Sequence, residues 1–463
     1  MSSNISDKLY YYSLLFIAIT IPFQWKYLPF TIGIIVLGII WLFNGRISTK
    51  IKIFFNNSYA IFLSSLYIIY LISLVYSENK EYAYIDLLLK LPLLLLPLFL
   101  STSEVLKKTQ ILIIIKAFAI STFFAALITF GIGYFNYIKT GMPKYFFYHD
   151  LEIFMHSAYY ALYALFAITT FIFLYIKTEN KKSKLAYSSM AFLLSGFLFL
   201  LSSRMQIGIF IILLTSFIIA RAIQKKRIFT GIIALFLSYA CIFLLITKMP
   251  KINERLQQTK QHIKNINYSQ TNSDPRVQIW KAALNVLKQN YAFGAGVGDA
   301  KDVLINEYRT LSEGRSENQK KVAQKIKEIK NNEAWFSHIK QKSKENNISI
   351  EDQLFEDAIY VLNDSKSRYK LYIKNGYNYH GQFLQTLSSV GLLGVFILIF
   401  SLLIPAYNLG LKNKNYLLLV FAIIVSGSLI TESMLERQAG VIFFAFFYCL
   451  LIFNSKLIAN KSS

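Results

Sequence analysis

Residues 375–400 read NGYNYHGQFLQTLSSVGLLGVFILIF, and within this stretch a polar region gives way to a continuously apolar one. An apolar run of ~20 residues is long enough to cross the hydrocarbon core of a bilayer as a helix. His380 lies at the boundary, although the chain has only 5 histidines. The stretch therefore predicts a membrane helix that is entered from a polar segment, with a titratable side chain at the point of entry.

The rest of the chain extends this pattern. It has 463 residues, of which 55% are hydrophobic and 16% are charged, and its mean hydropathy is +0.43. A soluble domain carries about a quarter charged residues. The apolar blocks are continuous and lack the alternation of barrel strands. We therefore expect an all-α polytopic membrane protein. About twelve spans are predicted, near residues 9–25, 27–43, 58–76, 83–101, 109–130, 153–176, 185–202, 205–221, 228–247, 383–407, 415–431 and 438–454.

The net charge of +24 is distributed in a way that indicates topology and argues against a nucleic-acid partner. Lys and Arg gather in the short loops NGRISTKIK, KTENKKSK, ARAIQKKR and KNKN, which all lie on one side if the N-terminus is cytoplasmic. Both termini are then cytoplasmic. The basic loops can also contact anionic membrane lipid. Cys241 and Cys449 fall in predicted spans, and no Cys/His spacing suggests a metal site.

One connection is much longer than the others. We expect a membrane region over 1–247, a mostly helical cap on the outer side over 248–382, and a closing membrane region over 383–463. In the cap, SDPRVQIWKAALNVLKQN (273–290) predicts a helix capped by Asp274, whose apolar face is Val277, Trp280, Leu284 and Leu287. The charge-dense residues 316–347 predict a solvated helix, and Ser349 and Asp352 have capping-box spacing.

Three basic residues at the predicted outer surface are candidates for function. Arg204 interrupts FLFLLSSRMQIGIFIILL and is either an interfacial anchor or a functional cation. Arg276 is either solvated, paired with Asp274, or a bidentate phosphate ligand. His380 either bonds locally, or accepts a proton or binds phosphate. Together these residues suit a lipid-linked diphosphate.

Two further motifs lie near these residues. In TESMLERQAGVIFF, residues 431–444, Glu432, Glu436 and Arg437 interrupt the outer ends of two apolar spans, and Glu436 and Arg437 either pair with each other or bind substrate. In GAGVGDA the glycines 294, 296 and 298 do not follow a strand. This loop therefore predicts a tight turn with close backbone approach rather than a dinucleotide site.

The segments LSSRMQIGIFIILL, DPRVQIWKAALNVLKQNYAFGAGVGDA and NYHGQFLQTLSSVGLLGVF, in this order around one long loop, resemble the O-antigen ligase and O-antigen polymerase superfamily of bacterial envelope enzymes. HSAYYALYALF, from His156, is similar to a segment of its relatives. Gly381 stands where a small polar residue is common in that superfamily, and residues 313–348 are longer than in its shorter ligases.

The resemblance implies a GT-C-type membrane glycosyltransferase of the inner membrane, with a periplasmic loop and no metal or other cofactor. Such ligases move a glycan from undecaprenyl diphosphate to lipid A-core and invert the anomeric centre. Arg204, Arg276 and His380 match the essential basic residues of the superfamily, and Glu432, Glu436, Arg437 and His156 are expected to contact substrate. A polymerase, whose acceptor is a second lipid-linked repeat unit, remains the alternative. A glycolipid flippase is less favoured because no internal repeat is evident.

Overall fold

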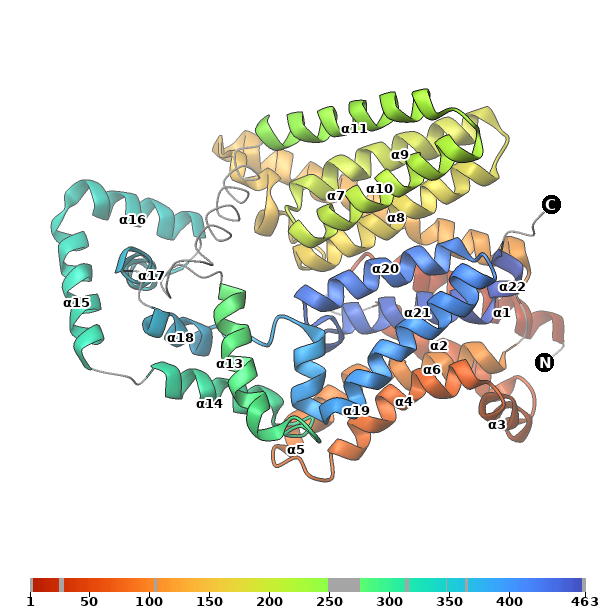
Figure 1. The fold of residues 1–463 in the computed structure, drawn as a ribbon, viewed down its shortest axis with the longest axis horizontal. Helices are drawn as coiled ribbons and strands as arrows, with labels where there is room; N and C mark the ends of the chain where they lie inside the picture. Colours follow the sequence, from red (N-terminus) through yellow and green to blue (C-terminus); the bar gives the residue numbers. More distant parts are fainter. Residues whose placement is uncertain are drawn as a thin grey trace. The chain divides into compact units, whose positions relative to one another are not determined.

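The computed structural model describes residues 3–24, 29–103, 106–248, 275–312, 316–346, 348–362 and 365–459. These residues are helical and include no strand, which confirms the all-α prediction (Figure 1). The chain divides into two compact units. Unit 1 comprises residues 1–72, 84–255 and 393–463, and unit 2 comprises residues 73–83 and 256–392. The expected helix cap by Asp274 and its expected pairing with Arg276 both involve a residue outside the described ranges.

Apolar helices make up unit 1. Its α-helices are α1 (Ser3–Thr20), α2 (Pro29–Phe43), α3 (Ile47–Phe55), α4 (Ser58–Ser73), α5 (Lys80–Lys90), α6 (Pro92–Thr102), α7 (Lys108–Thr140), α8 (Ser157–Lys177), α9 (Lys181–Leu200), α10 (Arg204–Gln224), α11 (Ile228–Lys248), α19 (Gln382–Pro405), α20 (Tyr416–Thr431), α21 (Gln438–Phe453) and α22 (Ser455–Ile458). The first residues of α5 and α19 and the end of α4 belong to unit 2. Short 3-10 helices lie at Pro143–Phe146, Tyr148–Leu151 and Met434–Glu436, and a π-helix at Ala406–Lys412 continues α19.

Every predicted span coincides with a helix, and several of these helices fit a bilayer. Among the described residues, 6 helices are long and apolar enough to cross a membrane, or up to 7 if α2 and α3 form one broken span. The six are Lys80–Thr102, Lys108–Thr140, Ser157–Lys177, Lys181–Leu200, Arg204–Gln224 and Gln382–Lys412. Four further apolar helices are shorter, among them α20 and α21. The helices thus fit the predicted class, a polytopic membrane protein, and the number of twelve spans stays a prediction.

The structure differs from the sequence prediction at NGRISTKIK. This stretch is not only a basic loop, because α3 begins at Ile47 and is bent by 110° from α2. Lys50 of α3 is buried, and its Nζ contacts the backbone oxygen of Trp41 and lies 4.6 Å from the centre of the Trp41 ring. A lysine with this cation–π contact is covered by protein rather than by solvent.

The core of unit 1 is built around α21. Its residues from Ala439 to Ile452 are all buried, and it packs against α6 and α20. Phe443 and Phe447 of α21 meet Phe118 of α7 and Phe166 of α8, with ring centres 4.5–5.8 Å apart. Such aromatic contacts bury large apolar areas in preferred geometries. The last predicted span is therefore the central helix of unit 1.

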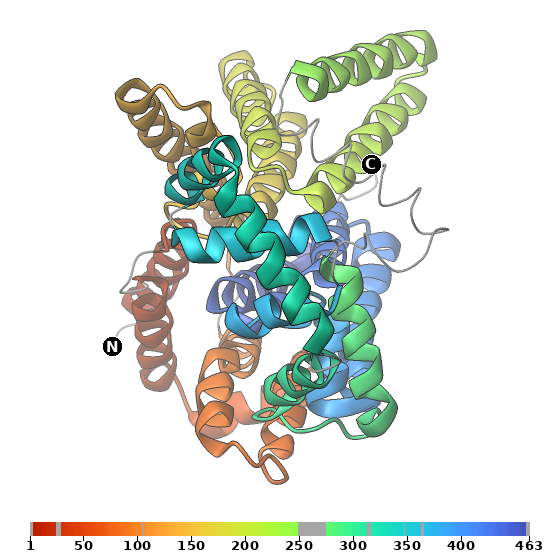
Figure 2. The ribbon, with the colours of Figure 1, turned by 90° about the vertical axis from the view of Figure 1, so that its left-hand side faces the viewer.

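Unit 2 contains α13 (Pro275–Asn290), α14 (Ala300–Ser312), α15 (Ser316–Asn331), α16 (Glu333–Asn346), α17 (Ile350–Leu362) and α18 (Ser365–Lys374) (Figure 2). The predicted apolar face of α13 is wrong in part, since Val277 and Leu284 are exposed. Ile279, Ala282 and Ala283 are buried instead, and they pack against α14 and α18. The small Ala side chains allow close helix packing, and the sequence pattern counted only the large ones.

The charge-dense region forms two helices, α15 and α16, rather than one. Val322 and Ile329 of α15, Ile339 of α16, and Leu354 and Ala358 of α17 form a separate small core. The predicted cap of α17 is confirmed, because the backbone N–H of Asp352 donates to Ser349 Oγ at 3.1 Å. This cap satisfies one of the free N–H groups at the start of the helix.

Candidate functional site

The basic candidate residues share one structural feature: each lies at the N-terminal end of a helix. Arg204 is the first residue of α10, Arg276 is the second residue of α13, and His380 comes two residues before α19. Arg437 and His156 are the N-cap residues of α21 and α8. A helix N-terminus carries a partial positive charge, which disfavours a nearby cation by about 0.3–1 kcal/mol. An anion bound there would reverse this cost, because side chain and helix dipole attract it together.

In unit 2 the chain makes an unusual turn at His380, whose φ is +45°. An L-residue with a side chain pays about 1–2 kcal/mol for this left-handed conformation. Two contacts hold it: the His380 N–H donates to Asn378 Oδ1 at 3.0 Å, and Trp280 Nε1 donates to the His380 carbonyl oxygen at 3.3 Å. Strain retained at such a residue is typical of functional sites.

The Trp280 contact also relates His380 to Arg276. Arg276 and Trp280 are four residues apart on α13 and so lie on the same face of that helix. Both Arg276 and His380 are half-buried. Unit 2 therefore places the guanidinium of the first turn of α13 on the helix face that contacts the His380 turn.

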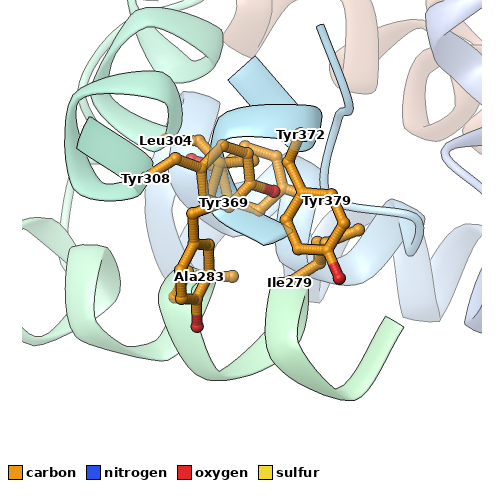
Figure 3. Packing of buried hydrophobic residues seen from close by; sticks show 8 residues of the cluster. Ile279, Ala283, Leu304, Tyr308, Tyr369, Tyr372 and Tyr379 are labelled. Atoms are coloured by element: carbon orange, nitrogen blue, oxygen red, sulfur yellow. The ribbon is translucent and has the colours of Figure 1, made fainter. Parts of the chain in front are cut away.

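A cluster of buried tyrosines, which the sequence analysis did not predict, packs next to the His380 turn. Tyr308, Tyr369, Tyr372 and Tyr379 gather between α13, α14 and α18 (Figure 3). The hydroxyl of Tyr379 donates to the Ala300 carbonyl oxygen at 2.8 Å and lies 2.5 Å from Ser388 Oγ. Burial raises the pKa of Tyr379 well above its ordinary value, so this hydroxyl stays protonated at neutral pH. Through these hydrogen bonds, Tyr379 fixes the backbone directly before His380.

The glycine loop at 294–298 has the close backbone approach that the sequence predicts. Gly294 and Gly296 have φ of +75° and +106°. The N–H groups of Ala295 and Gly296 donate to the carbonyl oxygens of Ser388 and Ser389, at 2.7 and 3.0 Å. A Cβ at Gly294 would lie 2.6 Å from the backbone of Ser389, so only glycine fits. The loop packs directly against the first half of α19.

In unit 1 the remaining candidates lie at one end of the helix bundle. Gln206 Nε2 of α10 donates to Ser428 Oγ of α20 at 2.5 Å. Arg204 lies two residues before Gln206, and Glu432 lies four residues after Ser428, as the C-cap of α20. These two antiparallel helices therefore bring Arg204 and Glu432 to the same end of the packed pair.

The start of α8 and the start of α21 reach this end as well. The Tyr163 hydroxyl of α8 donates to the Ala439 carbonyl oxygen of α21 at 2.8 Å. Tyr159, one turn earlier, lies near Glu432, Glu436 and Arg437. The structure thus gathers the ends of four helices with charged side chains of both signs.

His156 has a local role at this end. Its Nδ1 accepts a hydrogen bond from the Ala158 N–H at 3.3 Å, which caps α8. Its Nε2 lies 3.6 Å from Glu152 Oε1, and the same carboxylate oxygen accepts the Ser157 N–H at 2.9 Å. The imidazole is therefore held as part of the start of α8.

Glu436 pairs with Lys90 and not with Arg437, the partner that the sequence offered. Lys90 Nζ lies 2.9 Å from Glu436 Oε1 and 2.6 Å from both carboxylate oxygens of Asp86. Sequence reasoning missed Lys90, although Asp86 and Lys90 at i,i+4 spacing inside a predicted span give a recognisable signal. Arg437 is exposed.

Among the described residues, no group of three or more His, Cys, Asp or Glu side chains is arranged to hold a metal ion. Arg204 lies in unit 1, and Arg276 and His380 lie in unit 2.

Comparison with known proteins finds one similarity to a family, over part of the chain. The family model described as O-antigen ligase matches residues 189–323, a range that contains Arg204 and Arg276 and ends before His380. No curated protein matches the chain. The match agrees with the resemblance carried by the segments around Arg204 and Arg276. Residues 189–323 are thus similar to the O-antigen ligase family, and this match supports the resemblance to the O-antigen ligase superfamily.

Proposed function

We propose that this protein is a glycosyltransferase of the bacterial inner membrane that moves a glycan from undecaprenyl diphosphate to lipid A-core. The observation that carries the proposal is the position of its basic residues at helix N-termini, where a diphosphate gains from both side chain and dipole. The match of residues 189–323 to the O-antigen ligase family model supports the same chemistry. The donor tail would lie among the apolar helices, with a GT-C-type architecture, both termini cytoplasmic and the 248–382 segment periplasmic.

The proposed reaction is a direct displacement. An acceptor hydroxyl attacks the anomeric carbon, and the bond from this carbon to a diphosphate oxygen breaks, so that its electron pair leaves with the diphosphate. Arg204 and Arg276 would stabilise the negative charge that develops on the leaving group. The anomeric centre would invert. No nucleotide is required, because the free energy resides in the lipid-linked diphosphate. Arg204 and Arg276 would take the place of the divalent cation that many sugar transferases use.

His380 has two possible roles in this scheme. As a general base it would take the proton from the acceptor hydroxyl, and as a ligand it would donate a hydrogen bond to the diphosphate. We favour the general base. Trp280 and Asn378 fix the backbone of His380, which limits where its ring can lie. Such positioning contributes to rate because reacting groups must meet in a narrow range of geometries.

Envelope analysis of a deletion strain tests the proposal. Ligation predicts that polymer is lost from lipid A-core and accumulates on the carrier lipid. Polymerisation, the alternative, predicts core that carries single repeat units. Complementation with His380→Ala and Arg276→Ala should fail, while the exposed residues His338 and Lys281 supply matched controls, His338→Ala and Lys281→Ala, that should succeed. Full complementation by both site variants would contradict the assigned roles.

A further inference from the structure

A buried cluster of ionisable side chains lies inside unit 1, apart from the basic residues discussed above. Lys90 is fully buried at the end of α5, and the exposed fractions of the Asp86 and Glu436 side chains are 6% and 10%. Lys90 Nζ also lies 4.9 Å from the centre of the Tyr70 ring. An ionisable side chain within a membrane-spanning helix is costly and is retained where it has a function.

The cluster joins parts of the chain that are far apart in sequence. Asp86 and Lys90 lie on one helix and satisfy each other at i,i+4 spacing. Glu436 comes from the short turn Met434–Glu436, which connects α20 to α21. A buried ion pair adds little net stability compared with apolar side chains of similar volume, but it can favour one packing arrangement of the chain over the alternatives. Lys90 therefore has a partner on α5 already, and its contact with Glu436 fixes the turn.

This turn is also fixed by close packing on its other sides. A Cβ at Gly440 would lie 2.0 Å from the Met434 carbonyl oxygen, so the turn rests directly on the start of α21. Gln438 Nε2 donates to Thr31 Oγ1 of α2 at 3.1 Å. Glu432 precedes the turn and Arg437 follows it directly. Any movement of Glu436 would therefore displace both candidate substrate-binding side chains.

We propose that Lys90 is a positioning residue for the transferase: through Glu436 it holds the turn Met434–Glu436 and so keeps the flanking side chains Glu432 and Arg437 in place to contact the lipid-linked donor. The effect on donor binding rests on the proposed function. The effect on the turn rests only on the Lys90–Glu436 ion pair. Lys90 itself is buried and contacts no substrate. Loss of the pair should weaken donor binding while the reacting groups elsewhere remain in place.

The structural part is tested by thiol labelling of the purified full-length protein. Ser433 is buried in the turn, so Ser433→Cys should react with a water-soluble maleimide only when the turn opens. Cys241 is exposed and is first replaced by Ser. In this background Lys90→Met and Glu436→Gln should each raise the labelling rate about tenfold. Lys50→Met removes another buried lysine of unit 1, distant in sequence from the cluster, and should leave the rate unchanged. Unchanged labelling in both cluster variants would overturn the proposal.

The functional part is tested by steady-state kinetics with a lipid-linked donor. Lys90→Met and Glu436→Gln should raise the donor KM about tenfold with little change in kcat, whereas His380→Ala should lower kcat. Glu436→Gln keeps the size of the side chain and the Lys90–Asp86 pair, so it remains informative if Lys90→Met fails to fold. If the donor KM is unchanged in Lys90→Met and Glu436→Gln while His380→Ala is inactive, only the positioning role is refuted. If the cluster variants label faster but the wild-type protein transfers no glycan, the proposed function is refuted and the structural part of the inference stands.

Discussion

Trp280 Nε1 donates a hydrogen bond to the carbonyl oxygen of His380, across 100 residues of sequence, at 3.3 Å. This contact joins the helix that bears Arg276 to the residue that we propose as the general base. It also stabilises a backbone conformation that a histidine rarely adopts. The geometry of the proposed base therefore depends on a residue that does not itself react.

Trp280→Phe should separate the hydrogen bond from the packing of the ring. The variant keeps an aromatic side chain and loses the donor, so unit 2 should be less stable by about 0.5–1.5 kcal/mol. The turnover number should fall roughly tenfold because the His380 ring is less well positioned. Trp335→Phe changes a tryptophan of the separate α15–α17 core and serves as the control. Equal turnover of both variants and wild type would show that the contact is irrelevant to the reaction.

Gly391→Ala should prevent correct folding of the first half of α19. Gly391 has φ +70° and ψ −167°, which interrupts the helix, and a Cβ there would lie 2.0 Å from the Ala292 carbonyl oxygen. We expect at least ~2 kcal/mol of destabilisation, measured as a lower melting temperature in detergent. Gly196→Ala in α9, where no atom lies within 4 Å of the added Cβ, should be tolerated or slightly stabilising. A fully stable Gly391→Ala protein would contradict the kinked geometry.

Asp352 should contribute a pH-dependent term to the stability of unit 2. Hydrogen bonds from Lys374 and from Ser349 lower the pKa of this carboxyl below its ordinary value of 3.8. Because the folded-state pKa is lowered, the stabilisation is present above pH 3.8 and is lost as the pH falls through the lowered pKa. Asp352→Asn should therefore melt slightly below wild type at pH 7, and the difference should shrink in acid. Since Asp352 is exposed, the effect is small. A difference that grows in acid would have the wrong sign.

Much of the fold follows from the sequence because membrane helices are recorded in local composition. Each predicted span coincides with a helix, and α13 and α17 begin near their predicted starts. The helix α3 was missed because its lysines resemble a topogenic loop. Only the three-dimensional structure shows that Lys50 is covered by Trp41.

The candidate site could be predicted only in part, because many of its contacts join residues that are far apart in sequence. Arg204, Arg276 and His380 are visible because each interrupts or borders an apolar run. Contacts between distant residues leave no local pattern. The spacing of Asp86 and Lys90 signals a charged pair within a span, but it does not name Glu436 as a further partner, and nothing near Tyr379 indicates its bond to Ala300. The sequence offered Arg437 as the partner of Glu436 because it is adjacent. The structure instead uses a lysine from α5.

Transfer by the purified protein tests the central claim most directly. The full-length protein is mixed with an undecaprenyl-diphosphate-linked glycan and lipid A-core in EDTA, and glycan on the core is measured over time. We predict transfer by wild type, Lys281→Ala and His338→Ala. Arg276→Ala and His380→Ala should each lose about a hundredfold or more in kcat. A strict requirement for Mg²⁺, or wild-type rates in both site variants, would contradict the account.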